Sequence, residues 1–281
     1  MITTASVRHV EPVMGTMVSI DVREPRVDVA TARRAVADAV AWLHHVDAVF
    51  STYRDDSDIS RLGRGDVRIG EVSAEVREVL QTCVELSQAT DGAFNAFAVP
   101  APNGTRLDPS GYVKGWALER AAAMLHWDCT DHLCINGGGD VAVRGRAGPN
   151  RAWRVGIRHP ELADRLAAWV DLSAAHAIAT SATYERGAHI IDPRVQQPVT
   201  EIASATVLGD DLGVTDAYAT AVFVMGLDGI AWIEQQAGYE AFVITHEGTT
   251  AHSSGWPTPM PAHGANSEGG RAEPPRPQPA R

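Results

Sequence analysis

The sequence predicts an α+β fold, in which helices and strands occur in separate runs. Apolar residues in 29–50 and 73–90 recur about every 3.6 residues, which is typical of amphipathic helices. Between residues 132 and 180, short segments of strand-like pattern follow one another instead. Strict alternation of strand and helix is missing, so a doubly wound parallel sheet is not expected.

The individual elements can be placed in chain order. Ser73 can cap the second helix, and Gly92 lies just past its end. A third helix is expected over 114–125, and two more follow residue 208, the first of them opening at Thr215 and ending at Gly226. The expected strands are 132–136, 141–144, 153–158, 169–172, 177–180, 189–192, 205–208 and 240–245.

Composition excludes several classes of protein. The 281 residues are 44% hydrophobic and 21% charged, enough for one large domain or two small lobes. A net charge of −11 without a basic patch argues against a nucleic-acid surface. No apolar run is long enough for a membrane span, and the N-terminus lacks a signal-peptide pattern, so we expect a cytoplasmic protein. The three cysteines lack zinc-type spacing and are expected to be reduced thiols.

The C-terminal segment differs from the rest of the chain. Seven of the 16 prolines follow residue 253, and apolar residues become few. Such a segment buries too little apolar surface to offset the entropy lost on ordering. We therefore expect one domain over 1–252 and a disordered, proline-rich tail over 253–281.

Lys114 is the only lysine in the chain, and the other 23 of its 24 Lys and Arg residues are arginines. It stands near the expected start of the third helix, where exposed N–H groups favour an anion and a cation is unfavourable without one. The position predicts a phosphate contact, and the alternative is a solvated surface residue that is lysine by chance.

A glycine-rich segment, Asn136-Gly137-Gly138-Gly139-Asp140, follows an expected strand. The residues after it alternate as a strand, so the helix that holds a diphosphate in a Rossmann fold is missing. Two interpretations remain. The segment is a tight hairpin, or its backbone approaches a ligand closely while Asp140 accepts hydrogen bonds from a ribose or base.

Asp216 and Thr220 are four residues apart in an expected helix, so their oxygens share one face and could hold a hard cation such as Mg2+. The alternative is that Asp216 or Thr215 only caps the helix. His189 begins a short apolar strand and is a candidate general base, or else a structural hydrogen-bonding residue. Walker and nucleophile-elbow motifs are absent from the sequence.

Together these segments resemble the ApbE family, the FAD:protein FMN transferases. The matching pieces run in the family's order from residue 10 to residue 250. They are Met14-Gly15-Thr16, Phe50-Ser51-Thr52-Tyr53 with Ser57, 90–94, 108–117, 136–140, Ala179-Thr180-Ser181 with 184–186, 189–194 and 215–226. Three positions depart from the family pattern: Asn95, Ala182 and the pair Val195-Gln196.

The resemblance implies a two-lobed, T-fold-like domain that binds FAD between the lobes, with Mg2+ on the diphosphate. Its site residues carry over position by position. Flavin contacts would come from Met14, Thr16, Tyr53, Ser57 and Ser181, phosphate contacts from Lys114, and contacts to the AMP half from Glu119, Gly138, Gly139 and Asp140. The metal would be held by Asp216, Thr220 and the Val113 carbonyl, and His189 would be the base.

The implied activity is Mg2+-dependent transfer of the FMN moiety of FAD to a threonine or serine hydroxyl of an acceptor flavoprotein, with release of AMP. The chain lacks the family's acceptor pattern, Asp-x-x-Ser-Gly-Ala-Thr, so the acceptor would be another polypeptide carrying a Ser-Gly-Ala-Thr-type motif. Two alternatives remain open: an FAD pyrophosphatase that uses water as the acceptor, and a non-catalytic flavin-binding protein.

Overall fold

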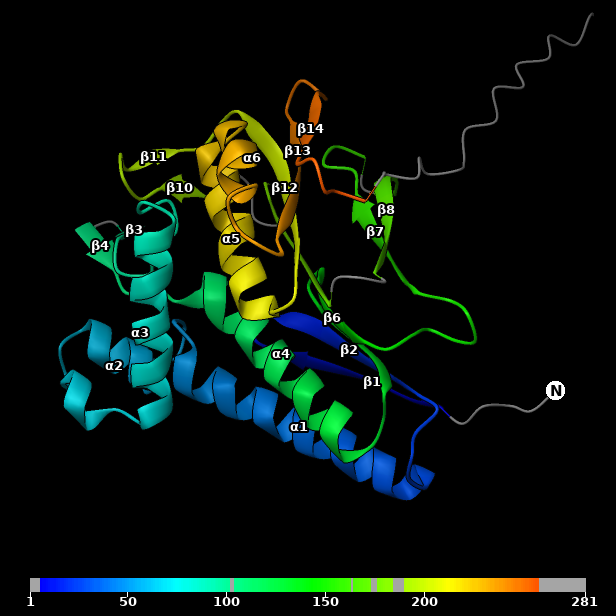
Figure 1. Cartoon of the computed structure of the whole chain (residues 1–281). Coiled ribbons are helices and arrows are strands. Elements are labelled where there is room, and N and C mark those ends of the chain that lie inside the picture. The colour runs from blue at the N-terminus through cyan, green and yellow to red at the C-terminus, as the bar shows by residue number, and fades with distance from the viewer. Residues whose placement is uncertain (1–5, 102–103, 163, 173–175, 184–189, 258–281) are drawn as a thin grey trace, which may run out of the picture.

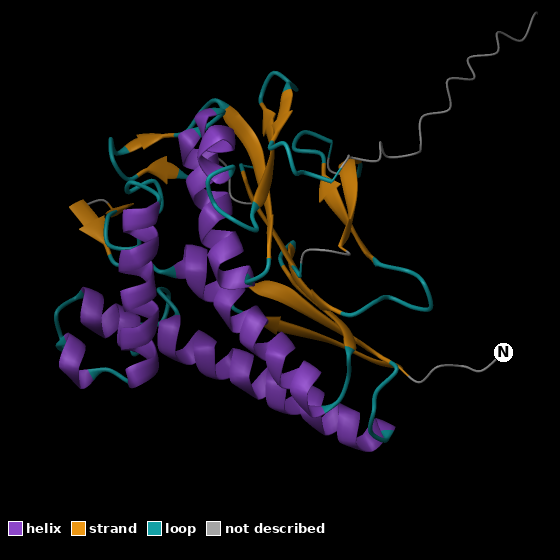
Figure 2. Ribbon diagram, viewed as in Figure 1, coloured by secondary structure: helices purple, strands orange, loops and turns teal. Residues whose placement is uncertain are grey.

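A computed structural model describes residues 6–101, 104–162, 164–172, 176–183 and 190–257. Its centre is an eight-stranded sheet in which every neighbouring pair is antiparallel (Figures 1 and 2). In spatial order the strands are β1 (Ser6–Val13), β2 (Thr16–Arg23), β5 (His132–Gly137), β6 (Asp140–Arg144), β9 (Ala177–Ala182), β12 (Ile202–Gly209), β13 (Glu240–Thr245) and β14 (Thr250–His252). This architecture agrees with the expected α+β class.

Helices cover one face of the sheet (Figure 1). The described helices are α1 (Val29–Phe50), α2 (Asp58–Gly63), α3 (Ala74–Ala89), α4 (Ser110–Asp128), α5 (Leu212–Met225) and α6 (Asp228–Ile233), with a short 3-10 turn at Ile69–Glu71. α5 is apolar on nearly all sides because it packs between the sheet and α4. None of these described helices is long and apolar enough to cross a membrane.

The opposite face of the sheet is covered in part by a hairpin of β7 (Trp153–Arg158) and β8 (Leu166–Leu172). It encloses a second apolar cluster, in which Trp256 stacks on Phe242 with ring centroids 5.6 Å apart. Ser253 is fully buried and accepts a hydrogen bond from the Ala241 nitrogen. The packed fold therefore runs to Trp256, past the boundary expected at residue 252, while residues 258–281 of the expected tail lie outside the described residues.

Two tight turns lie side by side at one end of the sheet. Met14-Gly15 joins β1 to β2 and Gly138-Gly139 joins β5 to β6, and all four residues have a positive φ. This left-handed geometry is what two-residue antiparallel turns require. A Cβ added at Gly138 would lie 2.9 Å from Thr16 Oγ1, so glycine also permits the two turns to approach. The glycine-rich segment is thus a hairpin, as one of the two interpretations predicted.

Two helices begin earlier than the sequence pattern indicated. α4 begins at Ser110, so Lys114 lies in its second turn and not among the exposed N–H groups at its start. α5 begins at Leu212 and is capped by Asp211, whose carboxylate accepts from the Val214 nitrogen at 2.9 Å. Asp216 is therefore an interior helical residue, and the capping interpretation of Asp216 is wrong.

Two small hairpins stand beside the helices, away from the main sheet (Figure 1). They pair β3 (Val99–Ala101) with β4 (Gly104–Arg106), and β10 (Ile191–Asp192) with β11 (Gln197–Pro198). The Gln196 amide donates to the Ala98 carbonyl at 3.3 Å and links the two. Together with the end of α1, the start of α4 and the middle of α5, residues of the two hairpins line a cavity.

Candidate active site

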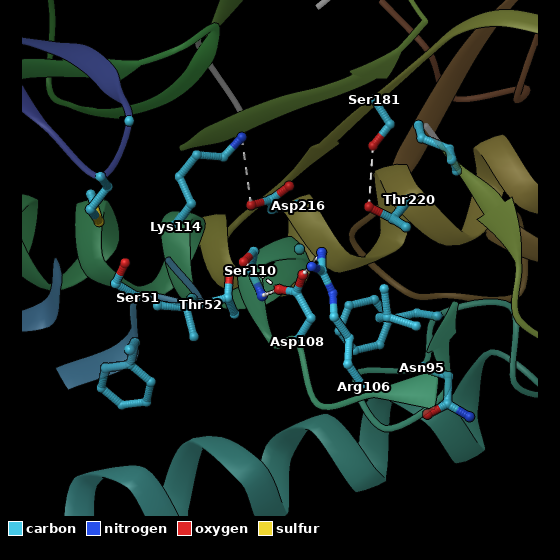
Figure 3. Close-up of a pocket in the computed structure, with 18 of the residues that line it drawn as sticks. Ser51, Thr52, Asn95, Arg106, Asp108, Ser110, Lys114, Ser181, Asp216 and Thr220 are labelled. Atoms are coloured by element: carbon cyan, nitrogen blue, oxygen red, sulfur yellow. Dashed lines mark hydrogen bonds and ion pairs between the residues drawn. The ribbon is translucent and has the colours of Figure 1, made fainter. Parts of the chain in front are cut away.

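A cavity of about 710 Å³ opens where α1 ends and α4 begins (Figure 3). This volume is in the range of sites that enclose nucleotide-sized ligands. Phe50, Phe94 and Ile190 contribute apolar walls. The polar lining includes Asp47, Arg106, Lys114, Ser181, Asp216 and Thr220.

The ammonium group of Lys114 lies between two buried carboxylates. Its Nζ is 2.5 Å from Asp140 Oδ2 and 4.0 Å from Asp216 Oδ2. Figure 3 shows the longer of these two contacts. Asp140 is 1% exposed, and its other oxygen accepts from the Thr180 nitrogen at 3.1 Å. The two carboxylates are therefore buried, while the Lys114 side chain is 28% exposed beside the cavity.

The position of Asp216 depends on a close crossing of α4 and α5. The Gly115 nitrogen donates to Asp216 Oδ2 at 3.3 Å. A Cβ at position 115 would lie 2.3 Å from the Leu212 carbonyl oxygen and 2.9 Å from Asp216 Cβ. Only glycine permits this crossing without a shift, so residue 115 sets how near the Asp216 carboxylate comes to Lys114.

Asp216 and Thr220 both line the cavity, as their four-residue spacing predicted. Thr220 Oγ1 lies 3.2 Å from Ser181 Oγ on β9, and Val113 lines the same space (Figure 3). A carboxylate, hydroxyls and a backbone carbonyl are hard oxygen donors of the kind that Mg2+ prefers. Among the described residues no group of three or more His, Cys, Asp or Glu side chains could hold a metal. The residues present fit a cation that completes its shell with phosphate and water oxygens.

Of the other residues expected to contact FAD, some line the cavity and some lie beside it. Met14 and Tyr53 line it, and Tyr53 is 81% exposed. Thr16, Gly138 and Gly139 belong to the adjacent pair of turns but are not lining residues.

Ser57 and Glu119 are not among the residues that line the cavity. Their side-chain oxygens form hydrogen bonds and ion pairs elsewhere in the fold. Ser57 caps α2 by accepting from the Ser60 nitrogen, and its hydroxyl donates to the Ser51 carbonyl at 2.7 Å. Glu119 pairs with Arg144 and accepts from the Leu212 nitrogen at 3.2 Å. These contacts give both side chains a structural role, and the nucleotide contacts that the resemblance implied for them stay a prediction.

His189 lies outside the described residues, as does the segment 184–186. The departures from the family pattern are described. Asn95 and Ala182 line the cavity, and Asn95 Oδ1 accepts from the Phe97 nitrogen at 2.9 Å. Val195 is exposed, and Gln196 has a positive φ of 58° in the turn between β10 and β11.

Sequence reasoning did not predict that Arg106 pairs with Asp108 beside the phosphate-binding candidates. Arg106 lines the cavity and donates to Asp108 Oδ2 at 2.8 Å, while Asp108 Oδ1 accepts from the Ser110 nitrogen at the start of α4 (Figure 3). Arg106 stands in a short segment without periodicity, in a chain rich in arginine. No pattern in the sequence distinguishes it.

A second such pair lies at the β10–β11 hairpin. The guanidinium of Arg194 donates to Asp192 at 2.7 Å and lowers the pKa of that carboxyl below its usual value. Pro193, between them, lines the cavity, so this ion pair stabilises part of the cavity wall.

Comparison with known proteins identifies relatives for most of the chain. The sequence model of the ApbE family matches residues 14–103 and 98–243. A Rhodobacter capsulatus protein named FAD:protein FMN transferase is 33% identical over 218 residues, which are 74% of this chain and 38% of that protein. The chain thus spans 38% and 43% of the length of the first two curated relatives that it matches.

Solved structures share the fold. The ApbE protein from Thermotoga maritima superimposes with a TM-score of 0.76 at 21% identity, over 89% of this chain and 97% of that one. The flavin transferase ApbE from Vibrio cholerae gives a TM-score of 0.74 at 23% identity, over 89% and 98%. At these identities the likeness concerns the fold.

Proposed function

The chain belongs to the ApbE family, and from this premise we propose that it is a flavin transferase that moves the FMN half of FAD to a threonine or serine hydroxyl of another polypeptide. The relative from Rhodobacter capsulatus carries the name of that reaction. The observation that supports the proposal best lies within this chain: Lys114, Asp216 and Thr220 line one cavity.

The diphosphate of FAD fits these three residues. An ammonium group is a compact positive charge suited to a phosphate oxygen. Mg2+ would be held by Asp216, Thr220 and the Val113 carbonyl, and when bound it would act as a Lewis acid on the diphosphate. The apolar wall that includes Phe50 and Phe94 would accept the flat flavin ring.

The proposed reaction is a displacement at the FMN phosphorus. The acceptor hydroxyl oxygen forms a bond to this phosphorus while the phosphorus–oxygen bond to the AMP phosphate breaks, and AMP leaves. Lys114 stabilises the charge that develops on the phosphate oxygens. His189 is proposed as the base that takes the hydroxyl proton, on the basis of the sequence alone.

Transfer, hydrolysis and simple binding differ in their products. The protein is incubated with FAD, Mg2+ and a peptide carrying the Ser-Gly-Ala-Thr-type motif, and both peptide mass and free AMP are measured. A peptide mass gain equal to FMN, with one AMP released for each, is the expected result. AMP release without a mass gain would show a pyrophosphatase, and FAD that stays intact would show a flavin-binding protein.

A further inference from the structure

Asp140 forms the shortest contact of the Lys114 ammonium among the described ion pairs, but it does not line the cavity. Its side chain is 1% exposed. Its Oδ1 accepts a hydrogen bond from the Thr180 nitrogen, and its Oδ2 forms an ion pair with Lys114 but has no hydrogen-bond partner among the described residues. A carboxylate with this arrangement is poorly placed to touch a nucleotide. We therefore look for the function of its negative charge in its contact with the Lys114 ammonium.

The backbone of Asp140 is held on both sides. It is the first residue of β6, and it pairs with Gly137 across the two-glycine turn. The next residue, Val141, pairs with Ile178 of β9, and the Thr180 nitrogen of the same strand fixes one carboxylate oxygen. Asp140 therefore cannot move far, whereas Lys114 is joined to α4 by a long, flexible side chain.

The ammonium has a second carboxylate within reach. Asp216 Oδ2 is 4.0 Å from Lys114 Nζ, and the Asp216 carboxylate is buried, so it attracts the ammonium at that distance. If the ammonium moved fully onto Asp216, it would compete with any cation that uses the same oxygen. The contact with Asp140 opposes that movement.

We propose that Asp140 is a positioning residue: it holds the Lys114 ammonium beside the cavity and away from Asp216, so that Asp216 can bind a divalent cation. The proposal rests on the proposed function, since that function assigns a cation to Asp216 and a phosphate to Lys114. It departs from the role that the family resemblance implied for Asp140, which was contact with the AMP half of FAD.

The test is a double-mutant cycle with Mn2+ as the probe for the cation site. Binding of Mn2+ alone is measured by electron paramagnetic resonance for the wild type, Asp140→Asn, Lys114→Met and the double variant. Asparagine keeps the size and an oxygen for the Thr180 N–H, but it loses the charge that attracts the ammonium. Asp21→Asn serves as the matched control, because Asp21 is a partly buried carboxylate paired with Arg23 outside the cavity.

We expect Asp140→Asn to weaken Mn2+ binding about tenfold when Lys114 is present, because the ammonium then moves onto Asp216. In the Lys114→Met background the same substitution should change binding by about twofold or less, because the residue through which Asp140 acts is gone. An equal loss in both backgrounds, or no loss in either, would overturn the proposal. Asp21→Asn should leave Mn2+ binding unchanged.

A measurement on the wild type keeps the proposal testable if Asp140→Asn does not fold or if no Mn2+ binds. Lys114 is the only lysine, so protein labelled with 15N lysine gives a single ammonium signal in an NMR spectrum. A motionally restricted ammonium is expected, and a freely mobile one would overturn the proposal. Failure of the wild type to bind Mn2+ alongside a restricted ammonium would count against the proposed cation site and leave the Asp140 contact supported.

Discussion

The Gly115 nitrogen of α4 donates a hydrogen bond to Asp216 Oδ2 of α5 across 3.3 Å. This contact joins the helix that carries Lys114 to the helix that carries the candidate cation ligands. One helix crossing therefore sets the positions of Lys114 and Asp216 relative to each other, and this crossing leaves no room for a side chain at position 115.

Gly115→Ala should destabilise the fold and reduce activity. The added Cβ would lie 2.3 Å from a backbone oxygen, so α5 must shift and carry Asp216 with it. Overpacking of this kind costs about 1–3 kcal/mol. Urea unfolding measures the change, and Gly70→Ala is the control because nothing lies within 4 Å of the added Cβ. Where nothing lies close to the added methyl group, alanine stabilises a helix by about 1 kcal/mol relative to glycine. A gain in stability for Gly115→Ala would therefore contradict the close crossing.

Asp216→Asn should abolish transfer while FAD still binds. The amide keeps the size of the side chain and an acceptor for the Gly115 N–H, but it loses the charge that a divalent cation needs. We expect the rate constant to fall about 100-fold or more, because a bound metal supplies several kcal/mol to the transition state. Turnover and flavin fluorescence are measured together, with exposed Asp228→Asn on α6 as the control. Full activity at limiting Mg2+ would remove Asp216 from the cation site.

Thr220→Val should raise the Mg2+ concentration needed for half-maximal rate by about tenfold, since it removes one of the oxygen donors and keeps the shape. Ser181→Ala should have a smaller effect, because it removes only the partner of the Thr220 hydroxyl at 3.2 Å. Thr206→Val makes the same chemical change in a buried pair with Thr180 and controls for stability. A Mg2+ requirement that is the same for Thr220→Val and Thr206→Val would be inconsistent with a ligand role.

Asp192→Asn should destabilise the protein in a pH-dependent way. The hydrogen bonds from Arg194 lower the pKa of Asp192 in the folded state, so their contribution is present above about pH 4, the unfolded pKa. It is lost as the pH falls through the folded pKa. At pH 7 the cost should be about 0.5–1 kcal/mol, because the Arg194 side chain is partly exposed. The urea midpoints of the wild type and Asp192→Asn are compared at pH 7 and at pH 2.5. A difference between the two proteins that is as large at pH 2.5 as at pH 7 would show another cause.

Much of the fold follows from local sequence patterns. The helices over α1 and α3 were predicted within a residue because their apolar residues form a continuous stripe. The start of α4 was missed by four residues, because Ser110 and Gly111 carry no apolar signal. The helix follows Pro109, and the Asp108 carboxylate accepts a hydrogen bond from the nitrogen of its first residue, Ser110.

From local patterns alone, the site was predictable only where its residues share one element. The Asp216 and Thr220 pair follows from helical periodicity, and both residues line the cavity as expected. The pairing of Lys114 with Asp140 does not follow from any local pattern, because it depends on how α4 packs against the start of β6. Resemblance to a family likewise could not show that the Ser57 hydroxyl caps α2.

The most direct test of the account is a crystal structure of the protein with FAD and Mn2+, in which anomalous scattering locates the metal. The account predicts one Mn2+ peak bound by Asp216 and Thr220, with the diphosphate bridging it and the Lys114 ammonium in the same cavity. A diphosphate bound elsewhere, or a metal with neither residue as a ligand, would contradict it.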